Sequence, residues 1–221
     1  MAKIFNRTVV RQFIEENREL YSNLSKIVGS KVKDIVSAGA LWDALSIESS
    51  HNYVWNKVWT PEEQLNVVKQ LSASHEMEFR YNWDSPVIKR LRGGGLVKEL
   101  NKNIESLVKD RNNRKLYVYS THDTTLTVLM HALNVYNGVS PPFGATLLFE
   151  LHEKRNSAQN NTNEYFVRAF YHNETVIDSG IPHSIHWTDC QNLVDCPLNQ
   201  YLNSTKHLLY ENFNEECNKK H

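Results

Sequence analysis

The sequence predicts an α/β fold, and the prediction depends on three consecutive stretches near its middle. KLYVYS, residues 115–120, is a short and mostly apolar run of the kind that forms a buried strand. Apolar residues recur at helical spacing on both sides of it, at Leu96, Leu100, Ile104 and Leu107 before the run and at Leu126, Leu129, Met130 and Leu133 after it. This helix–strand–helix order indicates an α/β layer with at least one buried strand.

The residues before this layer are predicted to be helical. A first helix is indicated by Val9, Phe13, Leu20, Leu24 and Ile27, and Gly29 is a typical stop after it. A second helix begins at TPEEQLNVV, where Thr60 and Glu63 form a capping box and Pro61 fits the first helical position. The segment between them carries Trp42, Trp55 and Trp59. These tryptophans favour packing between helices over the wall of a cleft.

Two antiparallel strands are expected after the layer, in ATLLFELH (145–152) and EYFVRAFYH (164–172), joined by a polar loop around Asn160. The chain is therefore divided into a helical portion at 1–91, an α/β portion at 92–180 and a cysteine-containing tail at 181–221. No internal repeat or low-complexity segment is visible.

Composition narrows the class of function. The 221 residues include 25 basic and 25 acidic side chains, so nothing points to nucleic acid or a membrane surface as a partner. No apolar run is long enough for a transmembrane segment, and the first ten residues do not resemble a signal peptide. No cluster of residues has the spacing of a metal site, and no cofactor is expected.

Cysteines and glycosylation sequons indicate an oxidising compartment. Cys190 and Cys196 are close enough in sequence to close a small disulfide loop, and the odd Cys217 suggests a bonding partner outside this chain. Candidate N-glycosylation sites begin at Asn6, Asn23, Asn160, Asn173 and Asn203. Together they favour a secreted or lysosomal protein.

The candidate functional residues lie in the turn STHDTTL, where the expected strand ends and a helix begins at about Thr124. Ligands of open α/β sheets collect at such places, and a helix N-terminus favours anions. One interpretation is structural, with Asp123 capping the helix and His122 packed or solvated. The other has His122 holding an anionic oxygen while Asp123 gives a proton to a leaving group.

The longer context YVYSTHDTTLTVLMHALNVYNGVSPPFGATLLFEL resembles the signature of the histidine acid phosphatases, in particular the animal prostatic and lysosomal branch. ESSHNY, RGGGLVKEL, FYHNET and CQNLVDCPL resemble further parts of that family in the same order, so the resemblance covers about residues 5 to 217. It implies a histidine-phosphatase-type α/β sheet domain with a helical cap domain. It also implies hydrolysis of small phosphate monoesters at acid pH, and it leaves a homodimer open.

The family's reaction proceeds through a phosphohistidine. By motif match, His122 resembles the phosphate-binding histidine and Asp123 the proton donor. The nucleophilic histidine belongs to an Arg-His-Gly motif, and no histidine of this chain is followed by glycine. The resemblance therefore implies that this chain is the C-terminal part of such a domain, without its N-terminal strand and half of its core. By the same family pattern, Cys190 pairs with Cys196 and Cys217 stays free.

Three functional hypotheses follow. The first is an acid phosphatase with half of its active site in this chain. The second is a catalytically inactive secreted paralogue or truncated product that keeps the fold and an anion-binding turn. The third, a phytase-like enzyme, is disfavoured because the resemblance to the animal branch extends well beyond the His-Asp pair.

Overall fold

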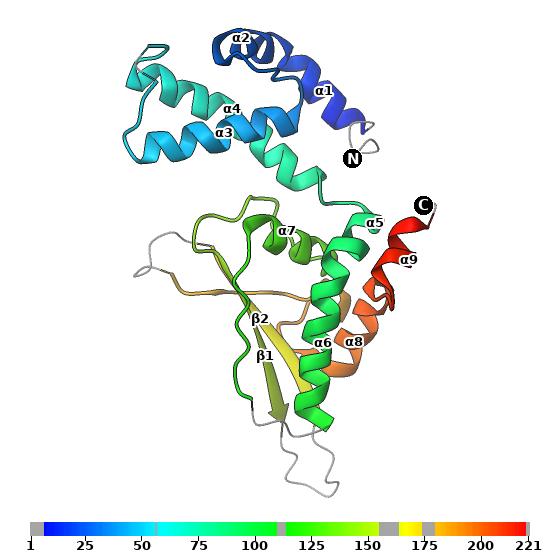
Figure 1. The fold of residues 1–221 in the computed structure, drawn as a ribbon. Coiled ribbons are helices and arrows are strands. Elements are labelled where there is room, and N and C mark those ends of the chain that lie inside the picture. The colour runs from blue at the N-terminus through cyan, green and yellow to red at the C-terminus, as the bar shows by residue number, and fades with distance from the viewer. Residues whose placement is uncertain (1–6, 56, 110–113, 155–163, 174–179, 220–221) are drawn as a thin grey trace, which may run out of the picture. The chain divides into compact units, whose positions relative to one another are not determined.

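A computed structural model describes residues 7–55, 57–109, 114–154, 164–173 and 180–219 (Figure 1). The chain divides into two compact units, Met1–Asn82 with Gly138–Ser140, and Trp83–Asn137 with Pro141–His221. The boundary between the units falls after Asn82, and the cysteine-containing tail belongs to the second unit. The predicted α/β class is confirmed, and the structure shows a helical majority with a small antiparallel sheet. The division into portions at 1–91, 92–180 and 181–221 stays a prediction.

The described part of the first unit is helical, with α1 (Thr8–Glu16), α2 (Arg18–Val28), α3 (Ile35–Ser50) and α4 (Pro61–Tyr81). Local signals set its helix ends as predicted. Gly29 ends α2 with a left-handed φ of 69°, which glycine adopts without steric cost. The capping box of Thr60 and Glu63 starts α4. The predicted first helix differs in one respect, because a turn at Asn17 divides it into α1 and α2.

The tryptophans of this unit pack between helices, as the sequence favours. Trp42 of α3 stacks on His75 of α4 with ring centroids 3.9 Å apart, and Trp55 stacks on Trp59. The Tyr21 hydroxyl also hydrogen-bonds the Ser74 hydroxyl at 2.9 Å, which ties α2 to α4.

The second unit combines a small antiparallel sheet with helices. Its strands are β1 (Thr146–Lys154), β2 (Glu164–His172), β3 (His183–Ser184) and β4 (Cys196–Pro197). Its helices are α5 (Pro86–Ile88), the π-helical η1 (Lys89–Gly93), α6 (Gly94–Lys109), α7 (Asp123–Ala132), η2 (Thr188–Cys190), α8 (Leu198–Thr205), η3 (Lys206–Leu208) and α9 (Phe213–Asn218). The two long strands predicted from the sequence are confirmed, because β1 pairs antiparallel with β2 from Thr146↔His172 to Lys154↔Glu164.

One face of this sheet carries the core of the second unit. Val167 and Ala169 of β2 are fully buried, and they pack with residues of α6, α7 and α8 that include Val97, Met130 and Tyr201. On the opposite face of β1, Leu148 is 38% exposed. The sheet is therefore buried on one side, which agrees with its alternating strand pattern.

Two glycines let the helices of this unit approach one another. A Cβ atom on Gly93 would lie 2.8 Å from the Cβ atom of Ala132 in α7, and one on Gly94 would collide with the carbonyl oxygen of Leu208. Any larger residue would push the backbones apart. The RGGG sequence thus permits close packing of η1 and α6 against α7 and η3, rather than simply preceding a helix.

The expected central strand at residues 115–120 is wrong. The structure places no strand there, and Leu116 and Val118 are 73% and 79% exposed. A strand obtains its hydrogen bonds from neighbouring strands, and the described residues supply none beside this run. The run is as apolar as a buried strand, but no partner that would bury it lies among the described residues.

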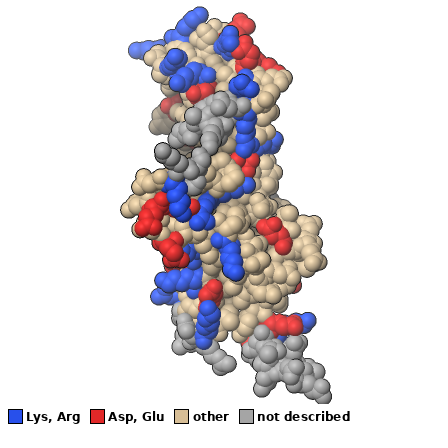
Figure 2. Space-filling view, turned by 90° about the vertical axis from the view of Figure 1, so that its right-hand side faces the viewer, with Lys and Arg blue, Asp and Glu red and all other residues tan. Residues whose placement is uncertain are grey.

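Surface charge is mixed. On the face that Figure 2 shows, basic and acidic side chains lie among uncharged ones, and neither sign forms a continuous field. None of the described helices is long and apolar enough to cross a membrane.

Candidate functional site

The His122–Asp123 pair lies at the start of α7, the helix N-terminus that the sequence predicts. His122 is the N-cap residue in an extended conformation, with φ −114° and ψ 160°, and its carbonyl oxygen accepts the amides of Thr125 and Leu126 at 3.0 and 3.1 Å. The helix begins at Asp123, one residue before the predicted start. Both side chains are exposed, so both can meet a ligand from solvent.

Of the structural interpretation, the Asp123 side-chain cap is absent, while the exposed His122 agrees with a solvated ring. The His122 side chain does not cap the helix, and among the described residues the Asp123 carboxylate accepts only the amide of its neighbour Thr124, at 2.5 Å. Within the part of the chain that the structure describes, the His122 imidazole has no hydrogen-bond partner. A second carboxylate oxygen and an imidazole are thus available beside the first turn of a helix, where the backbone dipole favours anions.

The rest of α7 holds this turn rigidly. Every residue from Thr127 to Ala132 is buried, and Thr127 also donates its hydroxyl to the carbonyl oxygen of Asp123 at 2.9 Å. The close approach of Gly93 in η1 fixes the far end of the helix against Val128 and Ala132. The exposed pair therefore sits on a buried and well-packed support.

On the other side of the turn, the chain is held only in part. The Tyr119 hydroxyl accepts a hydrogen bond from the Asn103 amide of α6 at 2.6 Å. Partial burial, aided by the negative charge of Glu99, raises the pKa of Tyr119. The helix that follows the His122–Asp123 pair is thus firmly packed, whereas the segment that precedes the pair is held by the hydrogen bond between Tyr119 and Asn103.

The Cys190–Cys196 disulfide is present, and it joins η2 to β4. Cys217 lies exposed on α9 and is bonded to neither. Among the sequons, Asn23 and Asn203 are exposed on α2 and α8, Asn173 is half-buried after β2, and Asn6 and Asn160 lie outside the described residues. Their glycosylation stays a prediction. No group of three or more His, Cys, Asp or Glu side chains in the described ranges is placed to hold a metal ion.

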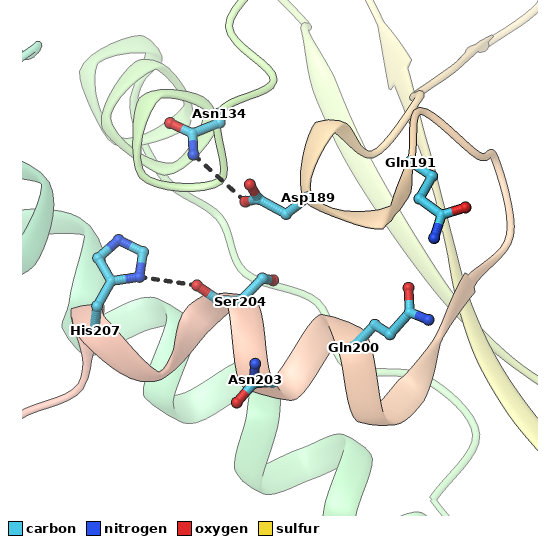
Figure 3. Close-up of a pocket in the computed structure, with 7 residues that line it drawn as sticks. All are labelled: Asn134, Asp189, Gln191, Gln200, Asn203, Ser204 and His207. Carbon is cyan, nitrogen blue, oxygen red and sulfur yellow. Dashed lines mark hydrogen bonds between the residues drawn. The ribbon is translucent and has the colours of Figure 1, made fainter.

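Sequence reasoning missed two hollows in the second unit. The larger, about 450 Å³, is lined by polar side chains (Figure 3), namely Asn134, Asp189, Gln191, Gln200, Asn203, Ser204 and His207. Its wall is partly fixed, since Asn134 donates to Asp189 at 3.4 Å and the His207 ring bonds the Ser204 carbonyl oxygen at 2.8 Å. Neither His122 nor Asp123 lines it.

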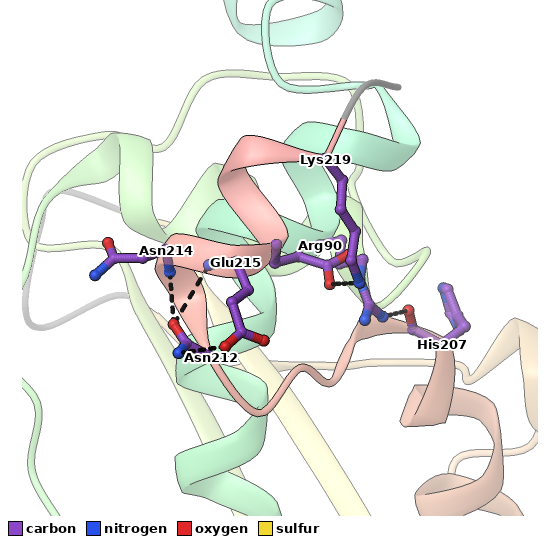
Figure 4. A network of polar contacts seen from close by, with 7 residues as sticks. Arg90, His207, Asn212, Asn214, Glu215 and Lys219 are labelled. Carbon is purple, nitrogen blue, oxygen red and sulfur yellow. Dashed lines mark hydrogen bonds and ion pairs between the residues drawn. The ribbon is translucent and has the colours of Figure 1, made fainter.

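The second hollow is lined by residues of a polar network that fixes α9, the C-terminal helix (Figure 4). Arg90 of η1 bonds the Glu216 carboxylate of α9 at 2.5 Å and also donates to the carbonyl oxygen of His207. Lys219 reaches the same carboxylate at 2.7 Å. The hydrogen bond from Arg90, and then that from Lys219, lowers the pKa of Glu216 to about 2. No pattern in the sequence could have paired residues so far apart.

Comparison with known proteins gives a family model that matches this chain over one continuous range. The model of the histidine phosphatase superfamily (branch 2) matches residues 6–172, which include β1, β2, α7 and the His122–Asp123 turn. This range covers most of the chain.

Curated relatives are acid phosphatases. The chain is 27% identical to the prostatic acid phosphatase of Bos taurus over 217 residues, which is 96% of this chain and 53% of that protein. It is 28% identical to the human prostatic enzyme, over 90% of this chain and 49% of that protein. Human lysosomal acid phosphatase is also 28% identical, over 80% of this chain and 39% of that protein. The chain thus spans about half the length of the curated prostatic relatives that it matches.

Proposed function

Since the chain belongs to the histidine phosphatase superfamily (branch 2), we propose that it supplies one half of an acid phosphatase-like active site. The observation that carries this proposal is the exposed His122–Asp123 pair at the start of a buried helix. Helix N-termini bind phosphate groups, and the pair adds an N–H donor and a proton source to the same turn.

His122 has the role of holding a phosphate oxygen. An imidazole N–H can donate to that oxygen, and the positive end of the α7 dipole lies beside the same charge. Donors that are fixed before the reaction stabilise charge on the transferring oxygens, because they need no reorganisation as it develops. The packing of residues Thr127 to Ala132 supplies that fixation.

Asp123 has the role of the proton donor. In the first step an imidazole nitrogen of a nucleophilic histidine attacks phosphorus, and an N–P bond forms as the ester P–O bond breaks. The protonated Asp123 carboxyl gives its proton to the departing alcohol oxygen. In the second step water attacks phosphorus, the N–P bond breaks, phosphate leaves, and the Asp123 carboxylate takes the proton from that water.

The nucleophile is proposed to come from outside this chain. No histidine among the 221 residues precedes a glycine, so the family's Arg-His-Gly motif has no counterpart here. The matched relatives are about twice as long as the shared stretch. On the same family premise, the substrate is a small phosphate monoester. The location is a secretory or lysosomal compartment, and in an oxidising compartment the Cys190–Cys196 disulfide persists. A homodimer stays a prediction.

The missing motif also favours a second candidate function. A non-catalytic secreted protein could keep the anion-binding turn without hydrolysing its ligand. The two candidates differ in whether a complementing half restores turnover.

The catalytic proposal is tested by the hydrolysis rates of phosphate esters whose leaving alcohols differ in acidity. The 221-residue chain alone is expected to show at most trace hydrolysis of p-nitrophenyl phosphate at acid pH. In the full-length or reconstituted protein, Asp123→Asn should slow esters of poor leaving groups by about 10²–10⁴-fold and p-nitrophenyl phosphate far less. Asp189→Asn, on the far hollow, is the matched control and should change neither. Equal losses for both ester classes would contradict the proton-donor role.

A further inference from the structure

The polar hollow of Figure 3 plays no part in the proposed reaction. It has a volume of about 450 Å³ and lies where the end of α7, η2 and α8 meet. Asn134, which lines it, follows the C-terminal end of α7, whereas the His122–Asp123 pair lies at the N-terminal end of that helix. The ten residues of α7 separate the two places by about 15 Å. The hollow is therefore distinct from the His122–Asp123 turn.

The side chains that line the hollow indicate a neutral ligand. Four of them are carboxamides, and the others are a hydroxyl, a carboxylate and an imidazole. No lysine or arginine belongs to this lining within the part of the chain that the structure describes, and Asp189 adds a carboxylate, so the wall does not suit phosphate or another anion. An apolar ligand would leave the carboxamides without hydrogen-bond partners.

The carboxamides of the hollow match the hydroxyl groups of a saccharide. A hydroxyl both donates and accepts hydrogen bonds, and each carboxamide offers N–H donors and a carbonyl acceptor. The side chains of Gln191 and Gln200 point toward one another across the hollow (Figure 3). Among the described residues, neither side-chain amide has a hydrogen-bond partner, so both are available to a ligand.

The wall opposite α8 is held in place before a ligand binds. Asn134 has a left-handed φ of 56°, which asparagine tolerates, and its side chain donates to Asp189 Oδ2 at 3.4 Å. The Thr188 hydroxyl donates to the Asn134 carbonyl oxygen at 3.3 Å, and the Cys190–Cys196 disulfide follows directly. Within the described residues Asp189 Oδ1 has no partner, so a fixed acceptor is available to a sugar hydroxyl.

We propose that this hollow is a saccharide-binding site, in which Asp189 accepts from a sugar hydroxyl while Gln191 and Gln200 bond its neighbours. Two sources have this chemistry: a glycan on the chain itself and a saccharide of another molecule. The first source is suggested by Asn203, which lines the hollow, is exposed on α8 and begins the sequon Asn-Ser-Thr.

Attachment of that glycan joins Asn203 Nδ2 to the anomeric carbon of an N-acetylglucosamine. The bond from this carbon to a lipid diphosphate donor breaks, and the amide nitrogen loses one proton. The first sugar of such a glycan begins at the wall of the hollow, so it reaches the carboxamides without a separate binding event.

The first arm of the test titrates the unglycosylated 221-residue chain, produced in bacteria, with N,N′-diacetylchitobiose, the first two sugars of an N-glycan. The side-chain amide signals of Gln191 and Gln200, followed by NMR, should shift saturably. Asp189→Asn keeps the size of the side chain and removes its charge, so it should weaken binding by about tenfold or more. Glu211→Gln, at a carboxylate outside this hollow, is the matched control and should bind as wild type does. Circular dichroism and thermal unfolding check that all three chains fold alike.

The second arm distinguishes the sources with the same chain secreted from eukaryotic cells, in which mass spectrometry measures the occupancy of Asn203. If the chain's own glycan is the occupant, the two glutamine signals should already lie at their sugar-bound positions. Added chitobiose should then not bind, and Asn203→Gln should restore its binding. An unoccupied Asn203, or a glycan that leaves the signals and the binding unchanged, would identify a saccharide of another molecule.

Three results of the first arm would overturn the proposal. The glutamine signals could stay unshifted at saturating chitobiose, or Asp189→Asn could bind as tightly as wild type. The same signals could also respond equally to inorganic phosphate, which would make the hollow an anion site.

Discussion

Helix α7 and the 115–121 segment are adjacent in sequence and similarly apolar, yet they differ completely in burial. Val128, Leu129 and Met130 of α7 are at most 3% exposed, whereas Leu116 and Val118 are more than 70% exposed. A helix satisfies its own backbone hydrogen bonds and needs only a surface to pack on, which η1, α6 and the sheet provide. A strand needs a neighbour for both backbone and side chains. The His122–Asp123 turn is therefore followed by a helix that is packed in the core and preceded by a segment whose apolar side chains are uncovered.

The largest expected effect comes from truncating one apolar residue in each region. Leu129→Ala removes side-chain atoms from a packed core and should lower the free energy of unfolding by about 2–5 kcal/mol. Leu116→Ala should change it by less than about 0.5 kcal/mol, because the side chain is largely in solvent. Urea unfolding of both variants measures the difference. Comparable losses would mean that the segment is buried in solution.

Local signals explain which parts of this fold could be predicted from sequence. The helix ends at Thr60, Glu63 and Gly29 are set by those residues themselves, so they can be predicted from sequence. The strands β1 and β2 pair with each other, and the alternating pattern of each strand predicts it. The strand expected at 115–120 is absent, because a strand forms only where a neighbouring strand pairs with its backbone. His122 and Asp123 were found through a motif, and their exposure and the missing side-chain cap needed the structure.

Long-range contacts were beyond sequence reasoning for a different reason. Arg90 and Glu216 are 126 residues apart, and nothing local to either indicates the other. The polar hollow of Figure 3 likewise joins the end of α7 to η2 and α8. Both features arise from the packing of the second unit as a whole.

The disulfide should matter next most, because it closes the η2–β4 loop beside the core on which α7 packs. Replacing Cys190 and Cys196 by alanine should destabilise the second unit by roughly 2 kcal/mol through the entropy of the unfolded chain. Cys217→Ser, at an exposed position on α9, is the control and should have no measurable effect. Thermal unfolding under non-reducing conditions compares them. A disulfide that includes Cys217 in a peptide map would contradict the assigned pairing.

A smaller effect should appear in the pH dependence of stability. Glu216 has a folded-state pKa of about 2, below its ordinary value near ~4.3 in the unfolded chain. Its contribution is therefore fully present above the unfolded pKa and is lost as pH falls through the folded pKa. The α9 contact with Arg90 should persist at pH 5 and weaken progressively below about pH 4.

Glu216→Gln measures that contribution. The variant should flatten the fall in stability between about pH 4 and pH 2, while Glu211→Gln, at a carboxylate that is almost fully exposed, should leave the curve as it is in wild type. Parallel pH profiles for wild type and Glu216→Gln would show that the network of Figure 4 does not hold the helix in solution.

The most direct test of the central claim is a titration of the 221-residue chain with inorganic phosphate at acid pH, followed through the imidazole signals of its histidines by NMR. We expect a saturable shift at His122 that Asp123→Asn alters and His122→Asn removes. The half-exposed His152 on β1, an internal reference, should stay unaffected. An unperturbed His122, or an equal response at His152, would contradict a phosphate-handling turn at the start of α7.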